Sequence, residues 1–333
     1  TYGEWWRFWE GKPKKEKAKQ ERVVKKGSKN TKNQTQSLVL SKQDEGTSTD
    51  PAQQLLDEAI EFYKKGLWKS ESERKGTESL EYYNKAIEKY EELVNKYPDS
   101  PLAPTAWDLM ASGYARKACY DDIEKRPYYL DKIIECFKKI LTDYPNSEEE
   151  KLVRYNIGSW YLVGKNYPKA IEYFQVQLSK YPIEGTKTIP TYMKMAVAYR
   201  KMGSYTEAIS VLQKFKKENP ENSWVIYYNA DAEIASSYEH LGNFDKALEI
   251  YLDIINKADP RLYPRALELD IVVYNIAWIY DEVKKDYINA EIWYKRFLKD
   301  YNNTILAGTV TERLDELEEL KEQGKLSTGK KKR

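Results

Sequence analysis

From residue 51 onward, apolar side chains recur every three to four positions and are separated by short polar breaks. This spacing predicts amphipathic helices, each with one buried face. The first helix is expected to begin where Asp50, a good N-cap residue, precedes Pro51. Prolines and two glycines mark the expected ends of later helices, at Pro98, Pro145, Pro182, Pro220, Pro260, Gly203 and Gly242. No stretch alternates as a strand would, so the pattern predicts an all-α fold.

One phrase is repeated along the chain. The segment NYPKAIEYFQVQLSKYP at 166–182 returns with variation at 204–220 and 243–260. Each copy contains an alanine three positions after an aromatic residue, and a fourth copy of this pair of residues follows further along the chain. The alanines are Ala170, Ala208, Ala247 and Ala290. Twelve residues before the first three alanines stand the small residues Gly158, Ala196 and Ala235. This spacing predicts pairs of antiparallel helices that approach closely where the small residues lie.

The repeated pattern resembles the tetratricopeptide repeat (TPR). The resemblance implies a right-handed α-solenoid of about six helix pairs over residues 51–303, in units 51–98, 99–145, 149–182, 186–220, 224–260 and 265–303. Unit one carries a polar insert, unit two has Ile133 in place of the alanine, and unit six has one extra residue in its turn. Residues 304–333 are expected to form a capping helix, over 304–323, and a basic tail.

Two Tyr-Pro-x-Ser sequences, at 97–100 and 144–147, link one unit to the next. They are similar to the linkers of TPR adaptors in the Gram-negative cell envelope, namely the lipoprotein of the outer-membrane β-barrel assembly machine and the coordinator of the Tol–Pal system. The resemblance implies a periplasmic or envelope location, with the cytoplasm as the alternative. The chain begins with Thr1, so we expect any signal peptide or lipid anchor to lie upstream.

Residues 1–50 differ from the rest and are expected to form an arm and linker. They hold twelve Lys or Arg against seven Asp or Glu and few apolar residues, a composition typical of a flexible segment. The exception is an aromatic cluster at the start: Trp5, Trp6, Phe8 and Trp9. Three interpretations stay open: the cluster docks on a partner protein, folds back on its own helices, or contacts a membrane surface.

The composition offers little chemistry for catalysis. The chain has 55 basic and 53 acidic side chains, a near-balance that argues against a general nucleic-acid binder. It has one histidine, His240, predicted to lie at a helix C-terminus, and two cysteines, Cys119 and Cys136, for which free thiols are favoured over a disulfide. No metal site, cofactor or catalytic residues are expected. No apolar run is long enough for a membrane-spanning helix.

In a TPR array the first helix of each unit faces a concave groove, so the resemblance also implies which residues face a partner. Counting from the small residue of each first helix gives four large apolar candidates: Tyr155, Met193, Tyr274 and Trp278. The alternative is that these side chains pack against neighbouring helices or the cap. A clamp for a carboxylate-ended peptide needs Lys and Asn at such positions, and Tyr155 and Ser159 stand there instead.

The sequence therefore predicts a non-enzymatic scaffold or adaptor that binds other proteins through the solenoid surface and the aromatic arm. One alternative is a structural subunit that self-assembles into a filament, ring or surface lattice, which would make the protein a homo-oligomer. Another is an accessory domain of an enzyme whose chemistry lies on a different chain or segment. Repeat folds are reused for many purposes, so the repeat sequence does not identify the partner.

Overall fold

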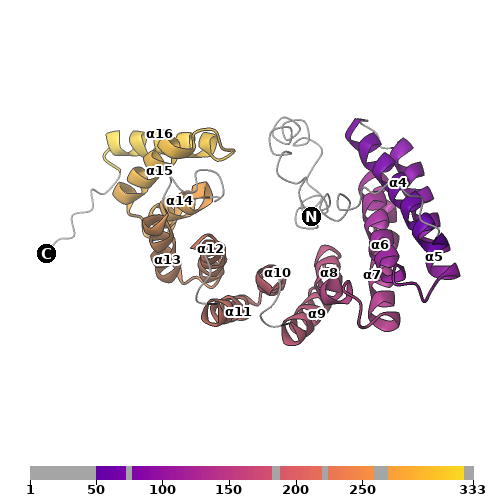
Figure 1. The fold of residues 1–333 in the computed structure, drawn as a ribbon. Coiled ribbons are helices and arrows are strands. Elements are labelled where there is room, and N and C mark those ends of the chain that lie inside the picture. Colours follow the sequence, from indigo (N-terminus) through magenta and orange to yellow (C-terminus); the bar gives the residue numbers. More distant parts are fainter. Residues whose placement is uncertain (1–49, 73–76, 182–187, 220–223, 259–268, 326–333) are drawn as a thin grey trace. The chain divides into compact units, whose positions relative to one another are not determined.

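The computed structural model describes residues 50–72, 77–181, 188–219, 224–258 and 269–325. Within these ranges thirteen α-helices and two short helical turns account for the regular structure, and no strand occurs among them (Figure 1). The predicted all-α fold is confirmed. The aromatic cluster at Trp5, Trp6, Phe8 and Trp9 lies outside the described residues.

In the described part of the chain, twelve helices form six consecutive pairs, as the repeat predicts, and one more follows them. The pairs are α4 (Pro51–Ser72) with α5 (Thr77–Lys96), α6 (Ala103–Tyr120) with α7 (Arg126–Asp143), α8 (Glu150–Val163) with α9 (Tyr167–Lys180), α10 (Thr188–Lys201) with α11 (Tyr205–Glu218), α12 (Trp224–His240) with α13 (Phe244–Lys257), and α14 (Leu269–Trp278) with α15 (Tyr287–Tyr301). The last helix, α16 (Ala307–Glu322), lies where the capping helix is predicted.

The chain divides into two compact units, residues 1–182 and 183–333. The first unit contains α4 to α9 and the second α10 to α16. Inside each unit a helix packs mainly on its neighbours in sequence, and each unit has its own core of buried apolar residues. This arrangement follows from the repeat, because a helix pair cannot bury both of its apolar faces alone.

Small residues allow the two helices of a pair to come close together. Ala170, Ala208, Ala247 and Ala290 are all buried. Gly158 shows how tight the contact is, since a Cβ on it would lie 2.6 Å from Cε1 of Phe174 on α9. That distance is far below van der Waals contact, so a larger residue would force the helices apart.

The turn inside a pair has the same form in four repeats. Residues 165, 203, 242 and 285 have positive φ, and the next backbone N–H donates to a carbonyl on the preceding helix, as from Asn243 to Tyr238 at 2.9 Å. Glycine suits this conformation at Gly203 and Gly242, whereas lysines adopt it at the other two. Side chains then cap the second helix, as when Asn243 Oδ1 accepts from the Lys246 N–H.

The Tyr-Pro-x-Ser sequences form the turn between two pairs. The Ser100 N–H donates to the Tyr97 carbonyl at 3.1 Å, and Ser147 bonds to Tyr144 in the same way. The Ser147 hydroxyl oxygen then accepts from the Glu150 N–H at the start of α8. The motif thus ends one helix and caps the next. This local role is enough to explain why tyrosine, proline and serine occur at these positions.

Two departures from the repeat have visible consequences. The longer turn of unit two forms a short 3₁₀ helix over Ile123–Lys125 before α7 begins. The extra residue of unit six is absorbed in a π-helical turn, η2 (Ile279–Val283), which directly continues α14. There the Lys284 N–H donates to the Ile279 carbonyl, five residues back.

A buried carboxylate links α8 to the end of α9 in the first unit. Glu150 is buried and accepts hydrogen bonds from Arg154, the Tyr181 hydroxyl and Lys180, the last at 2.9 Å. Burial by itself would raise the pKa of Glu150, but these three donors outweigh it and lower the pKa from 4.5 to about 2.

This network makes the stability of the first unit dependent on pH. Because the folded-state pKa of Glu150 is depressed, its contribution is present above pH 4.5 and is lost as the pH falls towards 2. Replacement of Glu150 by Gln should therefore lower the free energy of unfolding by about 2–3 kcal/mol at pH 6 and by much less near pH 2. Urea unfolding followed by circular dichroism at both pH values measures this difference.

The matched control is Glu148→Gln. Glu148 lies two residues away and pairs with Lys151, but its side chain is 84% exposed. An exposed pair of this kind contributes little, so the control should unfold like the parent protein at both pH values. Equal effects of the two substitutions would show that the buried network does not provide the pH dependence.

Candidate protein-binding site

A small open hollow lies in the second unit, where α14, η2 and α15 meet α16. Its volume is about 250 Å³, and it is lined by Tyr274, Trp278, Asp281, Glu282, Tyr294, Thr309 and Arg313. Helix α16 packs on the pair of α14 and α15, and α14 presents its outward residues beside it. The lining therefore combines residues from the last repeat with residues from the cap.

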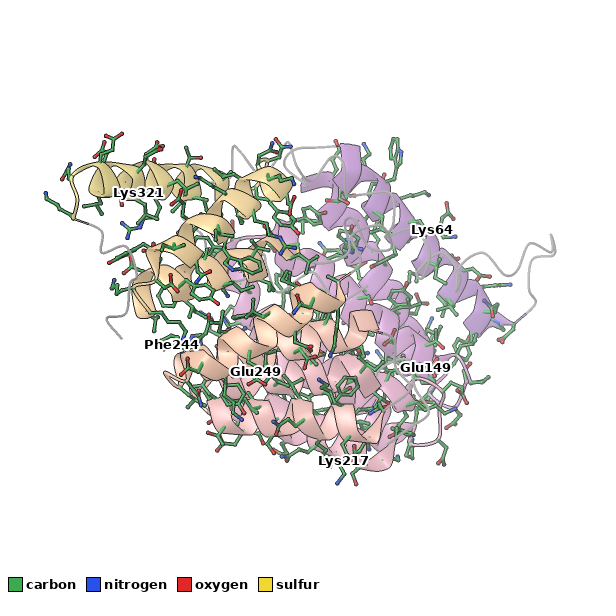
Figure 2. The ribbon with its side chains drawn as sticks, turned by 90° about the vertical axis from the view of Figure 1, so that its left-hand side faces the viewer. Lys64, Glu149, Lys217, Phe244, Glu249 and Lys321 are labelled. Carbon is green, nitrogen blue, oxygen red and sulfur yellow. The ribbon has the colours of Figure 1, made fainter. Side chains whose placement is uncertain are left out.

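Aromatic rings form the apolar part of the hollow. Tyr274 and Trp278 are one helical turn apart on α14, and both are partly exposed. The Tyr274 ring packs against Tyr294 and Phe297, each with a centroid distance of 6.4 Å. Trp278 lies 6.0 Å from Phe244 at the start of α13, a residue labelled in Figure 2. These contacts hold the two rings in place while part of each remains accessible to a partner.

An ion pair closes one side of the hollow. Asp281 is only 1% exposed and accepts two hydrogen bonds from the Arg313 guanidinium, at 2.7 and 2.9 Å. The Tyr294 hydroxyl donates a third, at 3.2 Å. Arg313 also pairs with Glu316 at 2.7 Å and approaches Glu282 at 3.5 Å. The lining thus combines three aromatic rings with two acidic side chains, one basic side chain and one hydroxyl group.

The π-helical turn places the buried carboxylate. Asp281 lies inside η2 (Ile279–Val283), whose wider backbone accommodates the extra residue of this repeat. Inserted residues of this kind are frequent at functional sites because they re-aim side chains. Here the insertion accompanies the contact between Asp281 and Arg313, 32 residues apart in the sequence, which ties the cap to the last repeat.

The structure brings two of the four predicted groove residues together. Tyr274 and Trp278 both line the hollow, and they also pack against neighbouring side chains. Met193 is partly buried on α10, elsewhere in the second unit.

Tyr155 requires a correction. It is 5% exposed on α8 in the first unit, and its ring centroid lies 6.3 Å from that of Phe174 on α9. Burial raises the pKa of the Tyr155 hydroxyl to about 12. Its side chain belongs to the interface between α8 and α9 and does not offer a surface to a partner.

The repeat pattern does not single out Arg313 or Thr309. Both lie on α16, which is separated from Trp278 by the whole of α15 and its flanking turns. A signal was available in principle, because a capping helix occupies the place of the next repeat's first helix and so borders the groove face of the last one.

A larger hollow, of about 750 Å³, lies in the first unit between α7 and the turn that follows α8. Its lining includes one aromatic ring, Tyr161, and three lysines, Lys138, Lys139 and Lys169. It contains none of the predicted groove residues. The hollow in the second unit is therefore the better candidate for recognition of a partner.

The described residues hold no cluster of His, Cys, Asp and Glu placed to bind a metal ion, and no described helix is long and apolar enough to cross a membrane. Both cysteines are free thiols, and burial raises the pKa of each, Cys119 and Cys136, to about 12. They are therefore poor nucleophiles at neutral pH. His240 lies at the C-terminus of α12, as predicted, stacked on Tyr205 with a centroid distance of 4.7 Å.

The consecutive helix pairs are consistent with a solenoid of tetratricopeptide repeats. The model of the tetratricopeptide-repeat family matches residues 83–100 and 191–222, one segment in each unit. Proteins of this class generally mediate protein–protein interactions and are typically not catalytic.

One solved structure is similar to this chain at the level of the fold. A tetratricopeptide repeat protein from Parabacteroides merdae ATCC 43184 is 16% identical, with coverage of 84% of this chain and 94% of that chain and a TM-score of 0.51. MamA is 22% identical over 55% of this chain and 96% of its own, with a TM-score of 0.42. YrrB, described as a TPR protein with an unusual peptide-binding site, is 14% identical over 67% and 97%, with a TM-score of 0.43. No curated protein matches the chain. The resemblance to cell-envelope adaptors finds no support in these comparisons.

The Asp281–Arg313 pair should be the main attachment of the cap. Replacement of Asp281 by Asn leaves the Arg313 guanidinium without its buried counter-charge, which should lower the free energy of unfolding by about 3 kcal/mol. Hydrogen exchange followed by mass spectrometry should show faster exchange over residues 307–322. The control is Glu316→Gln, which removes a 61% exposed partner of the same arginine and should change stability by less than about 1 kcal/mol. Similar exchange in both variants would contradict the assigned role of Asp281.

Proposed function

We propose that this protein is a non-enzymatic scaffold or adaptor that holds a segment of a partner protein at the hollow in its second unit. The observation that carries this proposal is the pair of rings, Tyr274 and Trp278, held by packing at the floor of an open hollow. Rigid aromatic side chains supply large contact area at a small entropic cost, and they are enriched among residues that dominate binding energy.

The size and rim of the hollow indicate what kind of ligand it accepts. A volume of about 250 Å³ is below the usual range of small-molecule sites and fits one or two side chains of a polypeptide. Thr309 and Glu282 lie at the same hollow and supply polar groups that could orient a backbone or a basic side chain. A helical or extended segment that places an apolar side chain between Tyr274 and Trp278 suits this arrangement.

The aromatic arm enters the proposal as a second point of attachment. Trp5, Trp6, Phe8 and Trp9 are tethered to the repeats by about forty residues, and Met193 on α10 offers a further apolar contact in the second unit. Two weak contacts joined in one chain bind a partner that engages both of them more tightly than either contact alone.

The proposed setting is the periplasm or cell envelope, with the cytoplasm as the alternative. Its support is the likeness of the Tyr-Pro-x-Ser linkers to those of envelope adaptors, although the turn geometry explains these linkers locally as well. Fractionation of cells into cytoplasmic, periplasmic and membrane samples, with detection of the native protein, tests this part. Recovery in the cytoplasm alone would reject it.

Quantitative affinity purification from native lysate tests the scaffold. Three full-length proteins are compared: the parent, Trp278→Ala, and a variant with Ala at Trp5, Trp6, Phe8 and Trp9. We expect Trp278→Ala to reduce recovery of the main partner at least tenfold, because the loss of a central aromatic contact costs about 2 kcal/mol or more. Circular dichroism confirms that the helices remain.

The matched control is Trp68→Ala, which removes a 66% exposed tryptophan from α4 in the first unit. This control should recover the same partners as the parent. If Trp278→Ala also recovers them unchanged, the hollow is not the binding site. If the arm variant alone loses them, the arm carries the attachment and the hollow does not.

A further inference from the structure

The accessible parts of Tyr274 and Trp278 can hold a positive charge as well as an apolar group. The face of an aromatic ring attracts a cation within about 6 Å of its centroid, most strongly when the ring belongs to tryptophan. A contact of this kind already occurs on α15, where the guanidinium carbon of Arg296 lies 5.0 Å from the centroid of the Trp293 ring. The charges around the hollow therefore decide which kind of side chain its rings prefer.

The charges that line the hollow are negative on balance. Asp281 and Glu282 carry two negative charges, and Arg313 carries the single positive charge of the lining. Arg313 donates to Asp281 through Nε and Nη2 and to Glu316 through Nη1, so its guanidinium is committed to carboxylates of this chain. The hydrogen bond to Asp281 is the main reason that the pKa of Arg313 is raised above its usual value. A further cation thus meets a basic group whose charge is already balanced.

Helix α16 adds negative charge beside the hollow. Its sixteen residues include six acidic side chains, all exposed, and two basic ones. Figure 2 shows the charged side chains projecting from this helix, with Lys321 labelled near its C-terminal end. Thr309 and Arg313 of α16 line the hollow, so the other charged residues of the helix lie no more than about three turns away. Exposed charges act over about 10 Å at moderate ionic strength, and this helix therefore favours a positive ligand.

Glu282 is the carboxylate that an incoming side chain can reach. Its side chain is 43% exposed, whereas that of Asp281 is 1% exposed. One Glu282 oxygen lies 2.9 Å from the Lys285 ammonium, in an exposed pair of the kind that contributes little. The other oxygen lies 3.5 Å from Nη2 of Arg313, which is longer than a usual hydrogen bond. Glu282 therefore has room to accept from a further N–H donor.

From these features we infer that the hollow of the second unit binds an arginine side chain of the partner segment. The inference rests on the proposed function and deepens it, because it names the side chain that the partner places there. The methylene stem of the arginine contacts Tyr274 and supplies the apolar part of the interaction. Its guanidinium stacks on Trp278 and donates to the Glu282 carboxylate.

Arginine suits the hollow better than lysine does. Its guanidinium is planar and stacks on an aromatic face, and it is more weakly hydrated than an ammonium group, so it loses less on leaving water. It also has five N–H donors in a fixed arrangement, which allows it to reach the Glu282 carboxylate and the exposed Thr309 hydroxyl together. A hollow of about 250 Å³ has room for one side chain of this size.

The hollow of the first unit has the opposite balance of charge. Lys138, Lys139 and Lys169 line it together with Asp131 and Glu135, and it has a single aromatic ring. An arginine side chain there meets a lining of its own sign and loses the stacking partner. Binding of arginine to this chain is therefore expected to depend on residues of the second hollow.

Three small probes test the inference on the full-length chain. N-acetyl-arginine methylamide carries the guanidinium, the citrulline analogue replaces it by a neutral urea of nearly the same shape, and the norleucine analogue carries only an apolar chain. Saturation-transfer difference NMR, with each probe titrated over the millimolar range, gives the dissociation constants. We expect the arginine probe to bind at least about threefold more tightly than either neutral probe, and added salt to weaken its binding.

Substitutions in the full-length chain then locate the bound arginine. Trp278→Ala and Glu282→Gln should each raise the dissociation constant of the arginine probe by at least about threefold. Glu282→Gln changes a side chain that is 43% exposed, so it tests the site without removing a packed ring. The matched controls are Trp68→Ala in the first unit and Glu318→Gln, an exposed glutamate of α16 outside the hollow. Neither control should change the binding of any probe.

Three results would overturn the inference: no binding of the arginine probe, equal or tighter binding of a neutral probe, or binding of the arginine probe that both Trp278→Ala and Glu282→Gln leave unchanged. Failure here is distinguishable from failure of the proposed function. If the arginine probe fails while Trp278→Ala still loses its partner from lysate, the scaffold proposal stands and the arginine inference falls. If the probe binds as expected while Trp278→Ala keeps its partners, the hollow binds arginine but is not the place where those partners attach.

Discussion

The close contact between the two helices of each repeat is the constraint on which the rest of the structure depends. Two helices can share a narrow interface only if small residues face each other, and Ala170, Ala208, Ala247 and Ala290 provide them. Gly158 leaves no room for even a methyl group beside Phe174. Once a pair is formed in this way, each helix still has an apolar face to bury, so the next pair must stack on it. Repetition of the pair is thus a physical requirement for stability.

Beyond the pair of α14 and α15 the arrangement changes. Helix α16 packs on this pair with an apolar side and has a charged outer side. The Asp281–Arg313 pair fixes the cap to the repeat. A carboxylate that is 1% exposed would be strongly destabilising alone, and it is tolerated because it receives three hydrogen bonds. The hollow beside it is a consequence of joining a repeat to a cap of different sequence.

The functional proposal rests on this same region. The thiols of Cys119 and Cys136 are held protonated by burial, and His240 caps a helix and stacks on Tyr205. What the second unit offers is an aromatic floor with an acidic helix beside it. Such a surface can bind and discriminate between polypeptide segments.

Much of the fold could be predicted from the sequence because its causes are local. Helix spacing, the prolines and the small residues at fixed intervals predict six helix pairs and a further helix after them, and the described residues form these elements. The sequence also showed the extra residue of the last repeat. It did not predict that this residue would be part of a π-helical turn, Ile279–Val283. Counting along the repeat predicted Tyr274 and Trp278, which line the hollow, and also Tyr155, which is buried against Phe174. Position in a repeat gives the direction of a side chain, whereas accessibility depends on the neighbours that pack over it. Arg313 joins the site across 32 residues of sequence, because only the packing of α16 on the last pair brings it to Asp281.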